Sequence, residues 1–527
     1  MKQMLKALVA LLIVMCLVLP VFAEGGKETG KVSGRAVPIE IWYGAAVTEA
    51  GPPPADWEVI KIIKDKLNID LKITALPSSP NDQDVKINAA GAANALPDLF
   101  MVSRPAWLNL VKNGLVADVS DMFAKMPVRT KAMYDQAAQS HTYYDDGKIK
   151  GNFGLASPGS IAKNEGLVIR KDWLDKLGLK VPTTLDEFFA VAKAFTEKDP
   201  DGNGKNDTYG FGAYLEINNL EGGLGRRFEP LAGAFGVEGS WNLSKSNFGL
   251  NVRKPAYFEF LQFVKKMMDE GVIDPNWMAY KKDDFRGAWK QGRFGMFREQ
   301  NAALHSESNY APFDKNFPNG ELIVIDAPKG PSGKQSMGPY NVAYRIYAVS
   351  KKSAGKKDAI ARLLEWMSSE EGYYLLGFGK ENVNYVKGPG GVPTDVGLAD
   401  PSKFYSKSEN QHLTQLRNMV FYNSDLELTA RYPTYTTAVS KKTMSALKTL
   451  RKMQSLTWTA CIGGDTIAPP KTDLKRFWEQ GILEFLTGKR PLVKENWTAW
   501  VAELDKMGAA QWEKEALEHC KANSLLK

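Results

Sequence analysis

The stretch IEIWYGAAVTEAGPPPADWEVIKIIKDKLNIDLKI, residues 39–73, decides the fold class of this chain. Apolar residues alternate with other residues at 39–43 and again at 69–73, the pattern of β-strands. Between them, apolar residues recur every three or four positions from Trp57 to Leu67, as in an amphipathic helix, and Asp56 is a candidate N-cap. The stretch therefore predicts two parallel strands joined by a right-handed helical crossover.

The same alternation continues along the chain. Strand-like apolar runs recur at 96–102, 165–171, 322–325 and 342–349, and helix-like runs lie between them. The last hundred residues are mainly helical in pattern. The sequence predicts an α/β fold with a mainly helical C-terminal region.

Composition limits the functions open to the chain. Its 527 residues suggest several domains, and its formal charge of +8 contains no block of five or more Lys and Arg residues, so nucleic acid is not an expected partner. Only four His are present, which disfavours a His-rich metal centre. The number of Trp residues, 13, is high, and Trp serves both core packing and stacking on ligands.

The N-terminus has the features of a secretory signal peptide. Lys2 and Lys6 precede an apolar run at 7–19 that is too short for a membrane span, and Ala23 ends a small-residue cleavage site. We expect a signal peptide at 1–23, a flexible leader at 24–38, and a periplasmic or cell-envelope location. Lipidation at Cys16 is the alternative, and the sequence leaves open whether Cys461 and Cys520 form a disulfide.

A loop at 199–210 has the ligand spacing of a calcium site. Side-chain oxygens fall at loop positions 1, 3, 5 and 9, Gly204 takes position 6, and a main-chain carbonyl falls at position 7. Position 12 is Gly210 instead of the usual Glu, and the alternative is a surface turn without an ion. We expect a structural calcium ion with these ligands: Asp199, Asp201, Asn203, Lys205 and Asp207.

Common enzyme motifs are absent from the sequence. It contains no H-E-x-x-H, G-x-S-x-G or G-x-x-x-x-G-K-[ST] motif, and its His residues are scattered. These absences favour a protein that is not an enzyme. A secreted, calcium-stabilised polysaccharide hydrolase or lyase stays open as an alternative, because paired catalytic carboxylates need not be adjacent in sequence. A surface adhesin or scaffold is a third possibility.

Several motifs in order resemble the bacterial extracellular solute-binding proteins of family 1. They are ALPDLF at 95–100, LVKNGLVADVS at 110–120, DGKIKG at 146–151, LVIRKDWLDKLG at 167–178, PTTLDE at 182–187, AVSKK at 348–352, and LLEWM at 363–367 followed by EEG at 370–372. The chain is most similar to the long members that bind oligosaccharides, including alginate-oligosaccharide binders. Those members carry a calcium loop where 199–207 falls here.

The resemblance implies a two-lobe periplasmic-binding-protein fold with an interlobe hinge. We expect the first lobe at 39–155 and 345–400, and the second at 156–344 and 401–527. It further implies a monomeric substrate-binding component of an ABC importer, which binds a carbohydrate in the cleft between the lobes and delivers it to the permease subunits in the membrane.

Sugars present apolar faces and polar rims, so aromatic and polar side chains are the candidate ligand contacts. Seven Trp lie in helix-like contexts and are expected to pack in the core: Trp57, Trp173, Trp366, Trp478, Trp497, Trp500 and Trp512. The other six lie at strand ends, in loops or in polar surroundings: Trp42, Trp107, Trp241, Trp277, Trp289 and Trp458. The predicted ligand-binding residues are Trp42, Tyr43, Arg104, Trp107, Trp241, Arg298, Glu299, Gln300, Tyr340 and Asn341.

Overall fold

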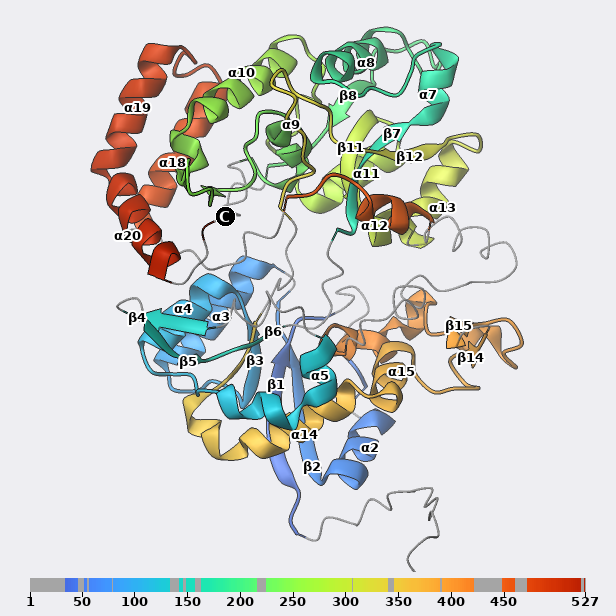
Figure 1. Ribbon diagram of the computed structural model, residues 1–527. Coiled ribbons are helices and arrows are strands. Elements are labelled where there is room, and N and C mark those ends of the chain that lie inside the picture. The colour runs from blue at the N-terminus through green and yellow to red at the C-terminus, as the bar shows by residue number, and fades with distance from the viewer. Residues whose placement is uncertain are drawn as a thin grey trace, which may run out of the picture.

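The chain folds into two lobes (Figure 1). The computed structural model describes residues 34–45, 52–54, 56–77, 79–132, 142–145, 148–156, 163–215, 224–305, 307–339, 346–388, 391–420, 448–459, 472–522 and 526. The predicted signal peptide and most of the predicted leader lie outside these residues. No helix among the described residues combines the length and the apolar character needed to cross a bilayer.

The first lobe is built on a five-stranded sheet of order β2-β1-β3-β13-β6. Its strands are β1 (Val37–Tyr43), β2 (Ile69–Ala75), β3 (Leu99–Val102), β6 (Leu155–Ala156) and β13 (Ile346–Val349). β1 pairs in parallel with β2 and β3, whereas β13 pairs antiparallel to β3 and β6. The predicted parallel unit at 39–73 is confirmed.

Helices and small hairpins complete the first lobe. The helices are α2 (Glu58–Leu67), α3 (Pro80–Ala92), α4 (Arg104–Lys112), η2 (Ser120–Lys125), α5 (Pro127–Ala132), η5 (Lys351–Lys356), α14 (Lys357–Met367), α15 (Glu370–Phe378), η7 (Pro401–Lys403) and η8 (Ser408–Met419). The hairpins are β4 (Thr142–Asp145) with β5 (Lys148–Asn152), and β14 (Val386–Lys387) with β15 (Pro393–Thr394). α2 starts after Trp57, whose side chain makes no capping hydrogen bond, so the prediction of Asp56 as its N-cap is wrong.

The second lobe is built on a four-stranded sheet of order β12-β7-β11-β8. Its strands are β7 (Glu165–Arg170), β8 (Tyr209–Gly212), β11 (Phe294–Gln300) and β12 (Leu322–Ile325). β7 runs antiparallel to β11 and β12, and β11 is parallel to β8. A short pair, β9 (Trp241–Asn242) and β10 (Gly249–Leu250), lies apart from this sheet.

Helices surround the second sheet, with the chain's last three grouped on one side (Figure 1). They are α7 (Lys171–Lys176), α8 (Leu185–Glu197), η3 (Arg226–Phe228), α9 (Glu229–Ala234), η4 (Asn251–Arg253), α10 (Pro255–Asp269), α11 (Lys282–Lys290), α12 (Asn301–His305), α13 (Glu307–Asn316), α18 (Thr472–Leu486), α19 (Lys494–Lys506) and α20 (Ala509–Ala522). α8 begins with the predicted capping box, in which Thr184 and Glu187 bond each other's backbone N–H. Cys520 is buried in α20, and Cys461 lies outside the described residues.

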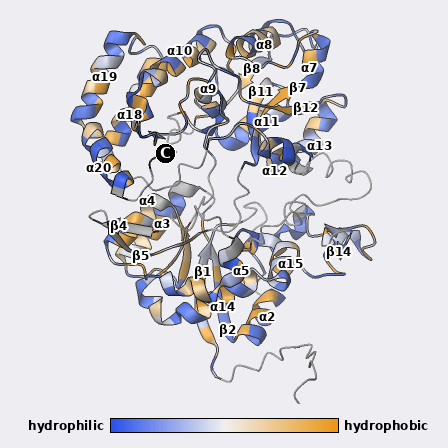
Figure 2. Ribbon diagram, viewed as in Figure 1, coloured by the Kyte–Doolittle hydropathy of each residue, from blue (hydrophilic) through white to orange (hydrophobic). Residues whose placement is uncertain are grey.

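Each lobe has its own hydrophobic core. One cluster joins the first sheet to α2, α14 and α15, and the two others lie in the second lobe. In Figure 2 the strands of both sheets carry much of the hydrophobic colour, and the helices are hydrophilic along much of their length. The separate cores confirm the predicted α/β fold with two lobes.

The described residues of segment 401–420 belong to the first lobe, which corrects the prediction that placed them in the second. Phe404, Tyr405 and Leu416 are buried in the first core. The ring of Tyr405 packs at 4.9 Å from that of Phe378 at the end of α15, and the Arg129 guanidinium donates to the Met419 carbonyl. The boundary falls later because these aromatic residues bury their area against α15.

Candidate functional site

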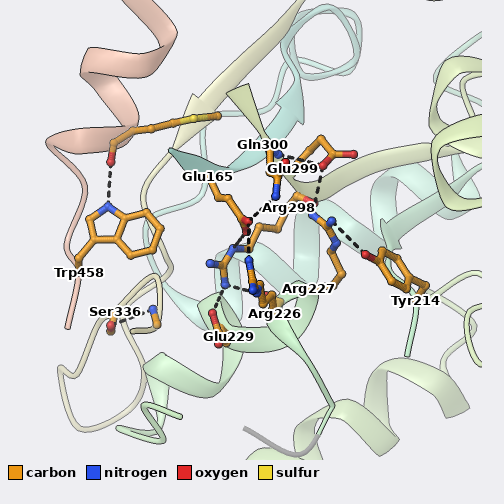
Figure 3. A network of polar contacts seen from close by, with 12 residues as sticks. Glu165, Tyr214, Arg226, Arg227, Glu229, Arg298, Glu299, Gln300, Ser336 and Trp458 are labelled. Atoms are coloured by element: carbon orange, nitrogen blue, oxygen red, sulfur yellow. Dashed lines mark hydrogen bonds and ion pairs between the residues drawn. The ribbon is translucent and has the colours of Figure 1, made fainter. Parts of the chain in front are cut away.

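Seven charged side chains form one cluster in the second lobe, called here the ionic cluster, and Figure 3 labels all of them except Arg286. Its members are Glu165, Arg226, Arg227, Glu229, Arg286, Arg298 and Glu299. They come from the start of β7, from η3, from α9, from α11 and from the end of β11. Five of the seven are buried, and Arg226 and Arg286 are partly exposed.

Arg298 is the centre of the ionic cluster. Its Nε lies 3.0 Å from Glu165 Oε2, and its Nη1 contacts Glu229 Oε2 and donates to the Arg226 carbonyl at 2.7 Å. Glu165 Oε1 in turn lies 3.3 Å from Arg226 Nη1. A buried guanidinium that meets two carboxylates and a carbonyl is fixed in orientation as well as compensated in charge.

Glu299 holds the other half of the cluster. Arg286 donates to both of its oxygens, at 3.0 and 3.2 Å, and Arg227 Nη1 lies 3.4 Å from Oε1. Arg227 also donates to the Tyr214 hydroxyl at 3.3 Å. Inside the lobe, Arg298 therefore contacts two acidic side chains, and its neighbour Glu299 contacts two basic ones.

The carboxylates of Glu165 and Glu299 stay ionised at neutral pH. Burial by itself would raise the pKa of Glu165, but the guanidiniums of Arg298, Arg226 and Arg227 outweigh it and hold the pKa at about 2. For Glu299, Arg227 and Arg286 likewise outweigh burial and lower the pKa. Both carboxylates therefore carry a negative charge at neutral pH.

The ionic cluster lies where the chain enters the second lobe. The chain passes between the two cores three times, between residues 156 and 163, 339 and 346, and 420 and 448. Glu165 follows the first passage by two residues. Gly338, just before the second, packs so closely on Glu229 that a Cβ there would lie 2.5 Å from Glu229 Oε2. The segment after the third passage carries Trp458, whose ring lies 5.6 Å from the Arg298 guanidinium carbon.

Two predicted ligand contacts of the first lobe are core residues. Tyr43 is 1% exposed and Trp107 is 0% exposed. The Trp107 indole donates to the Phe153 carbonyl at 3.0 Å. The predictions for Tyr43 and Trp107 are therefore corrected: these rings are covered by protein because they fill the core beside the sheet.

The other two first-lobe candidates stay predictions. Trp42 is partly exposed, with the Lys86 ammonium 4.6 Å from its ring and its Nε1 bonded to Glu40. Arg104 is the first residue of α4, and its side chain lies outside what the structure describes.

In the second lobe, three candidates are corrected by their burial. Trp241 packs edge-on against Trp512 at 5.0 Å, and Arg298 and Glu299 belong to the ionic cluster. Their surfaces and charges are directed at other protein groups. Gln300 is partly exposed and donates to Glu165 Oε1 at 3.1 Å.

Tyr340 and Asn341 lie outside the described residues. Among the predicted residues that are described, Arg298, Glu299 and Gln300 are brought together. The sequence analysis did not include their partners Glu165 and Glu229, although each is a charged residue that begins a mainly apolar segment.

The loop at 199–207 is organised by its own side chains. Asp199 accepts hydrogen bonds from the backbone N–H groups of Gly202, Asn203 and Gly204 at 2.9 to 3.1 Å. The Asn203 amide donates to Asp201 Oδ2 at 2.8 Å and to Asp207 Oδ1 at 3.1 Å, and its oxygen accepts from the Lys205 N–H at 2.8 Å.

The donor set of this loop suits a hard cation in its chemistry. Burial and then the neighbouring Asp199 raise the pKa of Asp201, as expected where carboxylates crowd one another. In the conformation described, though, the carboxylates do not gather on one point: no group of three or more His, Cys, Asp or Glu side chains in the described part of the chain is arranged to hold a metal ion.

Two α/β lobes with separate cores, joined by three chain passages, define a two-lobe binding protein. The chain belongs to the family described as bacterial extracellular solute-binding protein, whose model matches residues 55–374. The members of this family bind substrates and are not enzymes. The family therefore supports a binding protein over the alternative of a secreted hydrolase or lyase.

Individual relatives are similar along much of the chain. The polygalacturonan/rhamnogalacturonan-binding protein YtcQ of Bacillus subtilis is 29% identical over 389 residues, 72% of this chain and 74% of the relative. A solved HMO-binding, ABC-transporter-associated solute-binding protein of Bifidobacterium longum infantis matches with a TM-score of 0.68 at 17% identity, covering 94% of this chain and all of that one. The alginate-binding protein AlgQ2, solved without calcium ion, matches with a TM-score of 0.66 at 16% identity, covering 93% and 99%.

Proposed function

We propose that this solute-binding protein is the carbohydrate-binding component of an ABC importer and that its ligand is an acidic oligosaccharide of the polygalacturonan type. The observation that carries the proposal is the pairing of the two-lobe architecture with a 29% identical relative that binds polygalacturonan and rhamnogalacturonan. The ligand would bind between the lobes and be handed, unchanged, to the permease.

Calorimetric titration with a saccharide panel tests the ligand class. The panel contains trigalacturonate, an alginate trisaccharide, and neutral kestose and maltotriose. The proposal predicts binding of trigalacturonate at least tenfold tighter than of the neutral sugars, a difference of about 1.4 kcal/mol. Tighter binding of a neutral sugar would contradict the acidic class, and binding of no saccharide would contradict the carbohydrate assignment.

We also propose that the chain acts outside the cytoplasmic membrane as a monomer, after removal of residues 1–23. The charged start, the apolar run at 7–19 and Ala23 support this proposal. N-terminal sequencing of the exported protein should begin at Glu24. A mature chain that begins at a lipid-modified Cys16 would support the lipidation alternative. Light scattering measures the molecular mass of the exported protein and so tests whether it is a monomer.

We further propose a structural calcium ion held by Asp199, Asp201, Asn203, Asp207 and the Lys205 carbonyl. The oxygen donors of one short loop and the crowding of Asp201 support it. A bound cation would neutralise these carboxylates and hold the turn between α8 and β8. Such a role is structural and leaves ligand chemistry to other residues.

Chelation tests the calcium proposal. Removing calcium with EGTA should lower the melting temperature by several degrees, since an ion that binds only the folded state stabilises it, and excess calcium should restore it. A variant that combines Asp201→Asn with Asp207→Asn should melt at the chelated temperature and no longer respond. An equal melting temperature of the wild type with EGTA and with calcium would contradict the proposal.

A further inference from the structure

The exposure of the Trp residues singles out a small group. All 13 lie in the described residues, and ten of them are buried, with exposures of 7% or less. Only three are partly exposed: Trp42, Trp366 and Trp458. A ring can stack on a sugar only where its face is accessible, so these three are the Trp residues able to contact a ligand in this conformation.

Trp366 is remote from the junction of the lobes. It belongs to α14, a helix on the side of the first lobe that faces away from the second lobe (Figure 1), and its Nε1 donates to Glu371 at 3.1 Å. Trp42 belongs to the first lobe, has the Lys86 ammonium 4.6 Å from its ring, and stays a separate candidate. Trp458, in contrast, lies in the second lobe among the residues where the chain passages end.

The backbone around Trp458 is held on both sides. Thr457 donates from its N–H and its hydroxyl to the Asp326 carboxylate at 3.1 and 2.9 Å, and its carbonyl accepts from the Met337 N–H at 2.7 Å. Thr459 donates from its N–H to the Gly338 carbonyl at 3.2 Å. The segment that carries Trp458 is therefore bonded to residues 337–339, which lead into the second passage.

The indole itself is fixed at two points. Its Nε1 donates to the Met453 carbonyl at 2.8 Å, and the Arg298 guanidinium lies against one side of the ring (Figure 3). Arg298 is in turn fixed by Glu165 and Glu229. A partly exposed aromatic ring held this rigidly loses little conformational entropy when a ligand stacks on it.

We infer that Trp458 is a sugar-stacking residue of the ligand site, with Arg298 as the positioning residue that holds its ring. The inference rests on the proposed carbohydrate function. The apolar face of a pyranose ring would lie on the exposed part of the indole, while the ionic cluster stays covered on its inner side.

Titration of Trp458 variants tests the inference. The titrant is trigalacturonate, or kestose if the wild type binds only neutral sugars. Trp458→Ala should raise Kd tenfold or more, and Trp458→Leu, which keeps apolar bulk but has no ring, should raise it similarly. Trp458→Phe should stay within about threefold of the wild type, because it restores a stacking face. The ligand-free melting temperature of each variant is measured alongside.

Trp366→Ala is the matched control, since it removes an equally large and partly exposed indole far from the junction. Its Kd should remain within twofold of the wild type. If Trp458→Leu, folded as judged by its melting transition, also binds within twofold, the assignment of Trp458 is overturned while the carbohydrate function stands. If the wild type binds no saccharide of the panel, both are overturned.

Discussion

Replacing Arg298 by Met should lower the free energy of unfolding of the second lobe by about 3–5 kcal/mol. The substitution keeps much of the side chain's length and apolar bulk but removes the cation between Glu165 and Glu229. Both carboxylates are buried, so they are left with less compensation in a medium where an unpaired charge is costly. Urea unfolding followed by circular dichroism measures the loss.

An exposed arginine supplies the control for this prediction. Arg476 pairs with Asp473 at 3.1 Å, but 79% of its side chain is exposed. Arg476→Met should change the free energy of unfolding by less than about 0.5 kcal/mol, since exposed ion pairs contribute little. Equal losses for Arg298→Met and Arg476→Met would contradict a structural role for the ionic cluster.

Trp107→Ala should destabilise the first lobe by about 3–5 kcal/mol, the usual cost of removing a buried Trp side chain. The ring is fully buried, and its loss also leaves the Phe153 carbonyl without the indole N–H. Under conditions where the variant is folded, its Kd for the saccharide should match the wild type, because the ring has no surface to offer a ligand. Thermal unfolding and calorimetric titration measure the two quantities separately.

The expected effects of replacing Trp107 and Trp458 on affinity and stability are therefore opposite. Trp458→Ala should alter affinity more than stability, and Trp107→Ala should alter stability more than affinity. A Trp107→Ala variant that retains the wild-type melting temperature but binds the saccharide tenfold more weakly would support Trp107 as a ligand contact.

The sheets were predictable because their signals are local. The alternation at 39–43 and 69–73 and the capping box at Thr184 depend on residues that are close in sequence, and both are present in the structure. The end of the first lobe was not predictable in this way. The described residues of segment 401–420 join the first core through a few aromatic contacts, such as that of Tyr405 with Phe378. No periodic pattern in the sequence indicates such contacts.

The candidate site was predictable only in part, for a related reason. Positions at strand ends, in loops or in polar surroundings suggested accessible rings at Trp107 and Trp241, and Arg298 was a candidate because its side chain could hydrogen-bond sugar hydroxyls, yet all three are buried. Large rings are covered wherever the tertiary fold brings other apolar groups to them. Arg298 is buried because Glu165 and Glu229, 133 and 69 residues away along the chain, neutralise it.

We expect this protein to capture a carbohydrate and to release it unchanged. The most direct test is to follow the melting temperature and the ligand together. A hundredfold excess of trigalacturonate over Kd should stabilise the protein by about 2.7 kcal/mol. Chromatography of the same sample after prolonged incubation should recover the trisaccharide intact. A melting temperature that no saccharide changes, or the release of shorter sugars, would contradict capture of a carbohydrate without chemistry.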